Sequence, residues 1–298
     1  MQRATRSLAT AIVLAALLAG CGPPGGLDGD LVDDWAVLPP PGPFTPVAGI
    51  CHEADFAEVV PLGAYAPVDC ATPHRTETVY VGGFPAEQDD PPSTGSSELR
   101  TAFVECDNRA NVHVGDNWRV GRLRLAVAVP SEPGWAAGSR WYRCDLMEVN
   151  TVEAGARVVL RTGSLRDSLR TASPLRLGCQ QTRADGSGVV QALVPVACTE
   201  RHNAEFAGVW PAPDRQYPTR STQWAALYAG CRSVLARFAG VPDDDDLIFR
   251  ADVVVRPPSA GRWRVGDRGV RCYLWLSDRR VTGTLKGAGP TALPVRTK

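Results

Sequence analysis

The chain repeats itself at a spacing of 128 residues, and this internal repeat limits what it can fold into more than any other feature. Two motifs mark each copy. Pro-Val-x-Cys-x3-His-x2-Glu begins at Pro67 and again at Pro195, and Trp-x2-Gly-x-Arg-x3-Cys begins at Trp135 and again at Trp263. Because self-similarity at a fixed spacing is typical of a duplicated structural unit, the repeat predicts two tandem copies of one small fold.

The cysteines predict two disulfides in each copy. Eight of the nine cysteines lie in the repeat, four in each copy: Cys51, Cys70, Cys106, Cys144, Cys179, Cys198, Cys231 and Cys272. An even number per copy in an exported chain indicates a disulfide framework, but four cysteines allow three pairings and the sequence does not choose among them. We favour first with second and third with fourth in each copy, because the first two are 19 residues apart both times, which suits two strands of a hairpin.

The hydrophobic periodicity changes in the same order in both copies. Alternating stretches predict strands over residues 76–81, 122–129 and 141–146 in copy one and over 204–209, 249–255 and 270–276 in copy two. A helix is predicted after the first strand of each copy, capped by Ser96 or Ser97 and by Ser221 or Thr222. Its apolar face is predicted to comprise Leu99, Phe103, Cys106 and Ala110 in copy one, and Trp224, Leu227, Tyr228, Cys231 and Leu235 in copy two. Strands, one main helix and more strands predict an α+β fold in which each copy is a disulfide-stapled antiparallel sheet with one helix.

The N-terminus has the features of an export signal. Arg3 and Arg6 precede an apolar stretch, residues 8–18, that is too short to span a bilayer. It ends in Leu-Ala-Gly-Cys21, which resembles a bacterial lipobox. The resemblance implies that Cys21 is lipidated, for example with palmitate, and anchors the chain to the extracytoplasmic face of the cell membrane; an ordinary signal peptide is the alternative.

Five segments follow from these patterns. Residues 1–21 are predicted to be the lipoprotein signal peptide, and 22–46 a linker whose prolines and glycines prevent a packed core. The two copies are predicted to span residues 47–150 and 175–278, and residues 279–298 to form a flexible tail.

The charge balance argues against nucleic acid as a partner. Lys and Arg number 32, as do Asp and Glu, and removing the two leader arginines leaves 30 − 32 = −2. Because binding to a polyanion needs an excess of positive charge, we expect no nucleic-acid partner.

The Cys-x3-His-x2-Glu element holds the candidate binding residues His74, Glu77, His202 and Glu205. A thiol, an imidazole and a carboxylate are the parts of an activated nucleophile, but a cysteine in a disulfide cannot attack. One nitrogen and one oxygen ligand per copy are too few for a closed zinc site, which needs four. We therefore expect no catalytic residue, no bound metal and no cofactor.

The second motif contributes two further candidates, Arg140 and Arg268. Each could bind a carboxylate or a phosphate, but we favour a structural role in which the arginine stacks on a neighbouring ring and bonds to a carbonyl or to a nearby Asp.

Together the two motifs resemble the septum formation domain of actinobacterial cell-surface proteins, once per copy over residues 48–278. Copy one departs from the family pattern at Ser139, which stands in place of an acidic residue; copy two has Asp267 at this position. The resemblance implies a role in cell division. We expect a membrane-tethered, non-catalytic binding or scaffold protein whose partner is a cell-envelope protein or a cell-wall component. The alternatives are an envelope enzyme, either a thiol-disulfide exchanger or a hydrolase, and a sensor lipoprotein.

Overall fold

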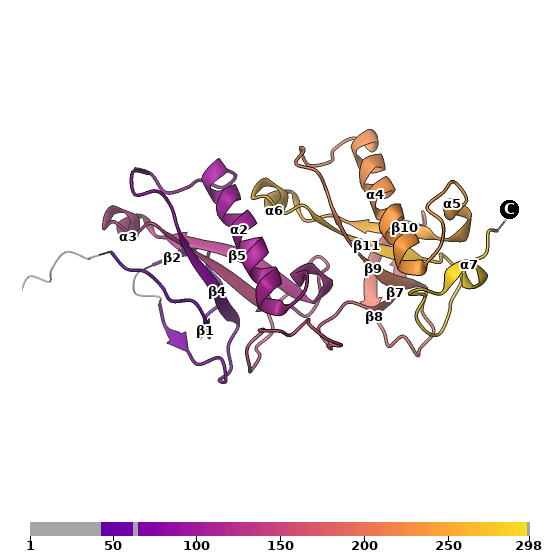
Figure 1. Ribbon diagram of the computed structural model, residues 1–298, viewed down its shortest axis with the longest axis horizontal. Helices are drawn as coiled ribbons and strands as arrows, with labels where there is room; N and C mark the ends of the chain where they lie inside the picture. The colour runs from indigo at the N-terminus through magenta and orange to yellow at the C-terminus, as the bar shows by residue number, and fades with distance from the viewer. Residues whose placement is uncertain (1–42, 62–64, 297–298) are drawn as a thin grey trace, which may run out of the picture. The chain divides into compact units, whose positions relative to one another are not determined.

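Each copy folds as a curled sheet with one long helix packed on one face, as the ribbon of Figure 1 shows. The structure is a computed structural model that describes residues 43–61 and 65–296. It confirms the predicted α+β class. The predicted signal peptide with Cys21, and residues 22–42 of the predicted linker, lie outside the described residues.

The elements recur in nearly the same order in the two copies. Copy one contains β1 (Ile50–His52), β2 (Val59–Val60), β3 (Pro67–Val68), β4 (Thr76–Gly83), α2 (Ser97–Val114), the 3-10 turn η2 (Trp118–Val120), β5 (Leu123–Pro130), α3 (Glu132–Ala136) and β6 (Trp141–Glu148). Copy two contains β7 (Cys179–Ala184), β8 (Val190–Pro195), β9 (Ala204–Pro211), α4 (Ser221–Ala239), α5 (Leu247–Arg250), β10 (Asp252–Arg256), α6 (Ala260–Arg264), β11 (Gly269–Trp275) and α7 (Gly289–Ala292).

The two sheets have the same strand order apart from an additional edge strand, β2, in copy one. The order is β2-β5-β6-β4-β1-β3 in copy one and β10-β11-β9-β7-β8 in copy two. Neighbouring strands pair antiparallel, except that the short edge strand β2 pairs parallel with β5. From Pro43 onward the chain forms one compact unit that contains both sheets.

The N-terminal end of helix α2 follows the sequence prediction. Ser96 is the N-cap, and its side chain accepts a hydrogen bond from Leu99 N at 3.2 Å. The helix ends at Gly115, whose φ of +81° is the left-handed conformation that glycine adopts at little cost.

Helix α4 departs from the prediction in two places. Its N-cap is Arg220, so both predicted capping residues lie inside the first turn, and Gln223 accepts the Arg220 N–H at 3.0 Å in their place. Tyr228 is 44% exposed. The buried stripe of α4 includes Val234, which moves its centre away from Tyr228 and leaves this side chain at the edge.

The strand predicted over residues 249–255 is shorter than expected at its start. Phe249 and Arg250 belong to helix α5, and β10 begins at Asp252. Leu247 of this short helix is buried against the second core, so a contact with the core outweighs the local strand propensity.

The predicted disulfides are confirmed. Cys51–Cys70 and Cys179–Cys198 join the first strand of each copy to the turn after the neighbouring edge strand, β3 or β8. Cys106–Cys144 and Cys231–Cys272 join the long helix of each copy to its sheet. Both cysteines of each helix-to-sheet pair are fully buried. Each copy therefore has a covalent link through the middle of its hydrophobic core.

The predicted copies are too short at their C-terminal ends. Leu165 and Leu169, between the two predicted copies, are fully buried in the first core. Leu285 and Leu293, in the predicted flexible tail, are buried in the second core. In each copy the chain returns after its last strand and fills space beside the sheet, because these leucines remove apolar surface from water.

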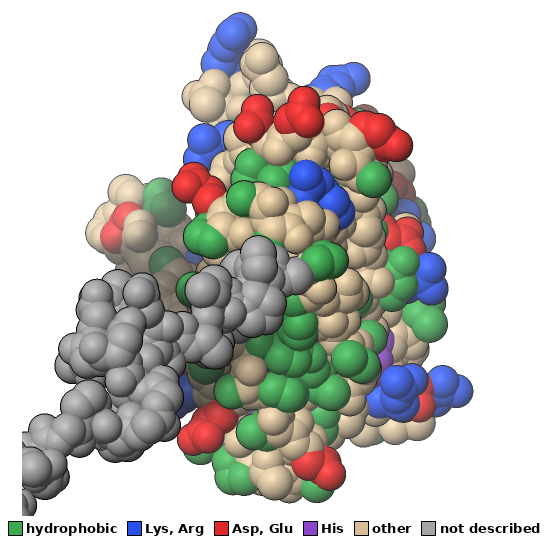
Figure 2. Space-filling view, turned by 90° about the vertical axis from the view of Figure 1, so that its left-hand side faces the viewer, with side chains coloured by type: hydrophobic (Ala, Val, Ile, Leu, Met, Phe, Trp, Pro, Cys, Tyr) green, Lys and Arg blue, Asp and Glu red, His purple; other side chains and the backbone are tan. Residues whose placement is uncertain are grey.

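Charged side chains of both signs surround a central group of hydrophobic side chains on the face that Figure 2 shows. Among the described residues, none of the helices combines the length and the hydrophobicity that crossing a membrane requires.

Candidate functional site

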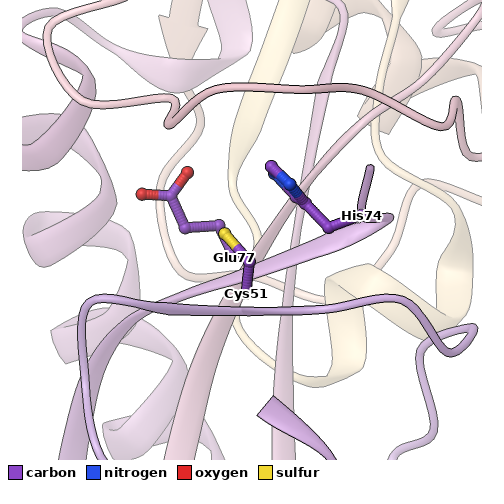
Figure 3. Close-up of side chains that lie close together, drawn as sticks. All are labelled: Cys51, His74 and Glu77. Carbon is purple, nitrogen blue, oxygen red and sulfur yellow. The ribbon is translucent and has the colours of Figure 1, made fainter. Parts of the chain in front are cut away.

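In each copy the His and Glu of the Cys-x3-His-x2-Glu element meet the disulfide partner of its cysteine, Cys51 in copy one and Cys179 in copy two, near one end of the sheet. Cys51 lies in β1, His74 just before β4 and Glu77 within β4, and each is buried. One ligand-type atom from each lies within 4.8 Å of the others, and Cys179, His202 and Glu205 repeat this arrangement. In Figure 3 the Glu77 carboxylate and the His74 ring extend to opposite sides of the Cys51 sulfur.

The histidines are bound through their backbone and one ring nitrogen. His74 Nδ1–H donates to the Thr72 carbonyl at 2.8 Å, and its backbone N–H and C=O bond to Arg161 at 2.8 and 2.9 Å. His202 makes the equivalent bonds to Glu200 and to Val281. The Nε2 atom of each ring is buried and has no hydrogen-bond partner among the described residues.

The Glu77 carboxylate holds residues 164–165, which follow the last strand of copy one, against the sheet. Its carboxylate accepts hydrogen bonds from Ser164 Oγ at 2.6 Å, Leu165 N at 2.6 Å and His113 Nε2 at 2.8 Å. Burial alone would raise the pKa of Glu77, but the hydrogen bonds from His113, Leu165 and Ser164 outweigh it and hold the pKa below its usual value. The carboxylate is therefore charged at neutral pH and fully used in holding residues 164–165.

Glu205 performs the same task in copy two. It accepts hydrogen bonds from Thr284 Oγ1 and, at 2.8 Å, from Leu285 N. Phe238 stands where copy one has His113, at the spacing of 125 residues that relates Cys106 to Cys231. An imidazole, that of His113, therefore hydrogen-bonds to the buried glutamate in copy one, whereas copy two has a phenylalanine at that position.

The sequence carried a signal for these contacts that its analysis missed. Residues 162–165 read Thr-Gly-Ser-Leu and residues 282–285 read Thr-Gly-Thr-Leu, 120 residues apart. A search for repeats beyond the fourth cysteine of each copy finds this pair. Its spacing differs from 128 because the segments before it differ in length.

The element does not assemble a nucleophile in this structure. The cysteine sulfur is in a disulfide, and both carboxylate oxygens accept hydrogen bonds from the chain. A metal ion would find one ligand atom without a partner in each copy, the histidine Nε2, whereas a closed zinc site takes four. The contacts are those of a structural clasp.

The motif arginines are also bound within the fold. The Arg140 guanidinium lies 4.3 Å from the centre of the Trp135 ring and donates to the carbonyls of Gln88, Trp135 and Ser139. Arg268 lies 4.6 Å from the centre of the Trp263 ring, and it pairs with Asp214 at 2.6 Å. Each arginine fixes the turn that leads into the last strand of its copy.

The residue between the glycine and the arginine of the second motif, Ser139 or Asp267, bonds its copy to a segment that lies earlier in the chain. The Ser139 hydroxyl donates to the Phe44 carbonyl and accepts the Phe44 N–H, both at 3.1 Å. Asp267 accepts from Arg119 of copy one at 2.7 and 2.9 Å and from Arg262 at 3.0 and 3.1 Å. Copy one thus has a serine at this position because the side chain bonds to the backbone of Phe44, whereas Asp267 of copy two pairs with two guanidinium groups.

A buried polar network distinguishes copy one from copy two. Thr78 Oγ1 and Arg143 Nε each donate to Asp145 at 2.8 Å, and Arg143 Nη1 donates to His52 Nε2 at 3.3 Å. All four residues are at most 5% exposed. At the equivalent positions copy two has Gln180, Phe206, Arg271 and Tyr273. Sequence analysis missed this network, although the replacement of His, Thr and Asp across a repeat is visible in the sequence.

The network predicts a loss of stability in mild acid. Burial, and then the positive charge of Arg143, lower the pKa of His52 from 6.5 to about 4, against a backbone hydrogen bond to Ala66 that raises it. The unfolded chain therefore binds more protons than the folded one between pH 6.5 and 4, and the free energy of unfolding falls as the pH falls through this range, by about 3 kcal/mol in total.

Denaturant unfolding of the protein and of His52→Gln at pH 7 and pH 4 measures this effect. Glutamine is the residue of copy two at this position and does not titrate, so the variant is expected to lose about 3 kcal/mol less than the wild type over this range. An equal loss in both proteins would assign the acid sensitivity to other groups.

A family model described as Septum formation matches residues 48–272, a single region that covers both copies. No curated protein and no solved structure matches the chain.

Proposed function

Because the chain belongs to the septum formation family, we propose that it acts outside the cytoplasm as a non-catalytic binding protein in septum formation. The family is not a known enzyme family. The observation that carries the proposal is that all eight cysteines of the described residues are paired in disulfides. Disulfides of this kind persist in oxidising compartments, which supports a position beyond the cytoplasmic membrane.

The N-terminal sequence supports a lipid anchor. The apolar stretch of the leader ends in Leu-Ala-Gly-Cys21, and the residues that follow are rich in proline and glycine. In this proposal the lipidated Cys21 holds the protein at the membrane, and the linker separates the folded unit from the lipid surface.

A binding role also agrees with the chemistry of the repeated motif residues, which hold segments of the fold together. The sulfur, carboxylate and guanidinium groups of both motifs are engaged by the chain itself. Two copies offer two surfaces to an envelope protein or a cell-wall component, and a second contact gains affinity through effective concentration.

Fractionation and imaging of the full chain in its native cells test the proposal. The wild type is expected in the membrane fraction and at division septa, and Cys21→Ser is expected in the soluble extracytoplasmic fraction. Cys21→Ala provides a second variant that lacks the thiol. Equal membrane retention of all three proteins would overturn the lipid anchor, and a uniform distribution of the wild type around dividing cells would overturn the septal role.

Complementation separates a binding role from catalysis. His202→Ala is expected to restore division in a deletion strain wherever it accumulates to the wild-type level. Loss of complementation with an unchanged melting temperature and cellular level would contradict the non-catalytic proposal.

A further inference from the structure

A cavity of about 720 Å³ lies between elements of the two copies. Its charged lining comprises Arg124, Arg256, Arg262, Arg271, Glu153 and Asp267. Four guanidinium groups therefore face two carboxylates, so the charged lining has an excess of two positive charges. The volume lies in the range of small-molecule sites and far exceeds that of a single water molecule.

Two of the four arginines are neutralised within the lining. Arg256 Nε donates to Glu153 at 3.1 Å, and Arg262 donates twice to Asp267 at 3.0 and 3.1 Å. Asp267 is also shared with Arg119. Both carboxylates of the lining are thus already committed.

The other two arginines have no acidic partner among the described residues. Arg124 donates to the Ala156 carbonyl at 3.3 Å, and Arg271 Nε donates to the Arg119 carbonyl at 3.0 Å. Burial lowers the pKa of both guanidinium groups, and the nearby Arg262 lowers that of Arg124 further. For Arg271 the charges of Tyr273 and Asp267 act in the opposite direction but do not outweigh burial, so both shifts reflect the cost of holding positive charge out of water.

An aromatic ring and two hydroxyl groups lie beside the arginines of the lining. Trp118 lines the cavity, and the guanidinium groups of Arg262 and Arg271 lie 5.6 and 5.9 Å from the centre of its ring. Thr151 and Ser259 add hydroxyl groups to the lining. Guanidinium and hydroxyl donors around an open volume are groups with which proteins recognise an oxyanion.

We propose that this cavity binds a small organic ligand through a carboxylate or phosphate group held by Arg124 and Arg271. The oxyanion supplies the negative charge that the lining lacks, and the remaining volume accommodates the body of the ligand. The inference stands on the cavity alone and does not depend on a role in septum formation.

Isothermal titration of the full chain with pyrophosphate and with citrate tests the proposal and separates the two head groups. At least one probe is expected to bind, and Arg124→Gln is expected to weaken its binding at least tenfold. Arg183→Gln is the matched control, because Arg183 is exposed in β7 outside the cavity and its replacement removes the same charge. The probe that binds more tightly identifies phosphate or carboxylate as the favoured group.

Thermal unfolding provides a readout that a merely structural arginine would not give. Without ligand, Arg124→Gln is expected to melt no lower than the wild type, because it relieves repulsion from Arg262. With the bound probe in excess, the melting temperature is expected to rise for the wild type and for Arg183→Gln but not for Arg124→Gln. Absence of binding by both probes, or equal weakening by the two substitutions, would overturn the proposal.

Discussion

Replacing Cys106 and Cys144 together by alanine is expected to lower the free energy of unfolding by about 4 kcal/mol, since the disulfide closes a loop with a sequence separation of 38 and restricts the unfolded chain. Both sulfur atoms are fully buried between α2 and β6, so their removal also leaves a gap in the core. Denaturant unfolding of the wild type and of the double variant measures the difference.

The matched control is the double replacement of Cys51 and Cys70. This disulfide spans a separation of only 19 residues, and Cys70 is half-buried, so the expected loss is about 3 kcal/mol. If the control variant lost more stability than the Cys106/Cys144 double variant, the Cys106–Cys144 disulfide would not be the one that stabilises the fold more.

Asp267→Ala is expected to cost about 3–5 kcal/mol at pH 7, because among the described residues it deprives the buried Arg119 of one of two carboxylate partners and Arg262 of its single carboxylate partner. Asp267 is 2% exposed and Arg119 is 4% exposed. Burial would raise the pKa of Asp267, but Arg119 and Arg262 outweigh it and hold the pKa below its usual value. The stabilising charge is therefore fully present at pH 7 and is lost only as the pH falls through that lowered pKa.

Two further variants make this prediction specific. Ser139→Ala, at the same motif position in copy one, removes two neutral hydrogen bonds and is expected to cost only about 1 kcal/mol. Adding Arg119→Met to Asp267→Ala is expected to recover part of the loss, because the double variant no longer buries that unpaired charge. Equal losses of stability for Ser139→Ala and Asp267→Ala would contradict the conclusion that the ion pairs of Asp267 cause the larger loss.

Features that depend on local order along the chain were predictable. The period of 3.6 residues identified both long helices, alternation identified most strands, and equal cysteine spacing in two copies favoured the disulfide pairing that the structure has. Errors at this level, such as the strand start at residue 249 and the cap of α4, arose where a contact with the core or a neighbouring Gln outweighed the local preference.

Contacts between residues far apart in the chain could be identified only from the tertiary structure. Glu77 meets Leu165 across 88 residues, and Arg119 meets Asp267 across 148, so no local pattern announces either contact. The sequence by itself determined a duplicated, disulfide-linked α+β chain, because spacing and periodicity are properties of the chain. Only the tertiary structure showed that the Cys-x3-His-x2-Glu element holds distant segments together and that two arginines beside a cavity have no acidic partner in the described part of the chain. Burial and partners exist only after distant segments have packed together.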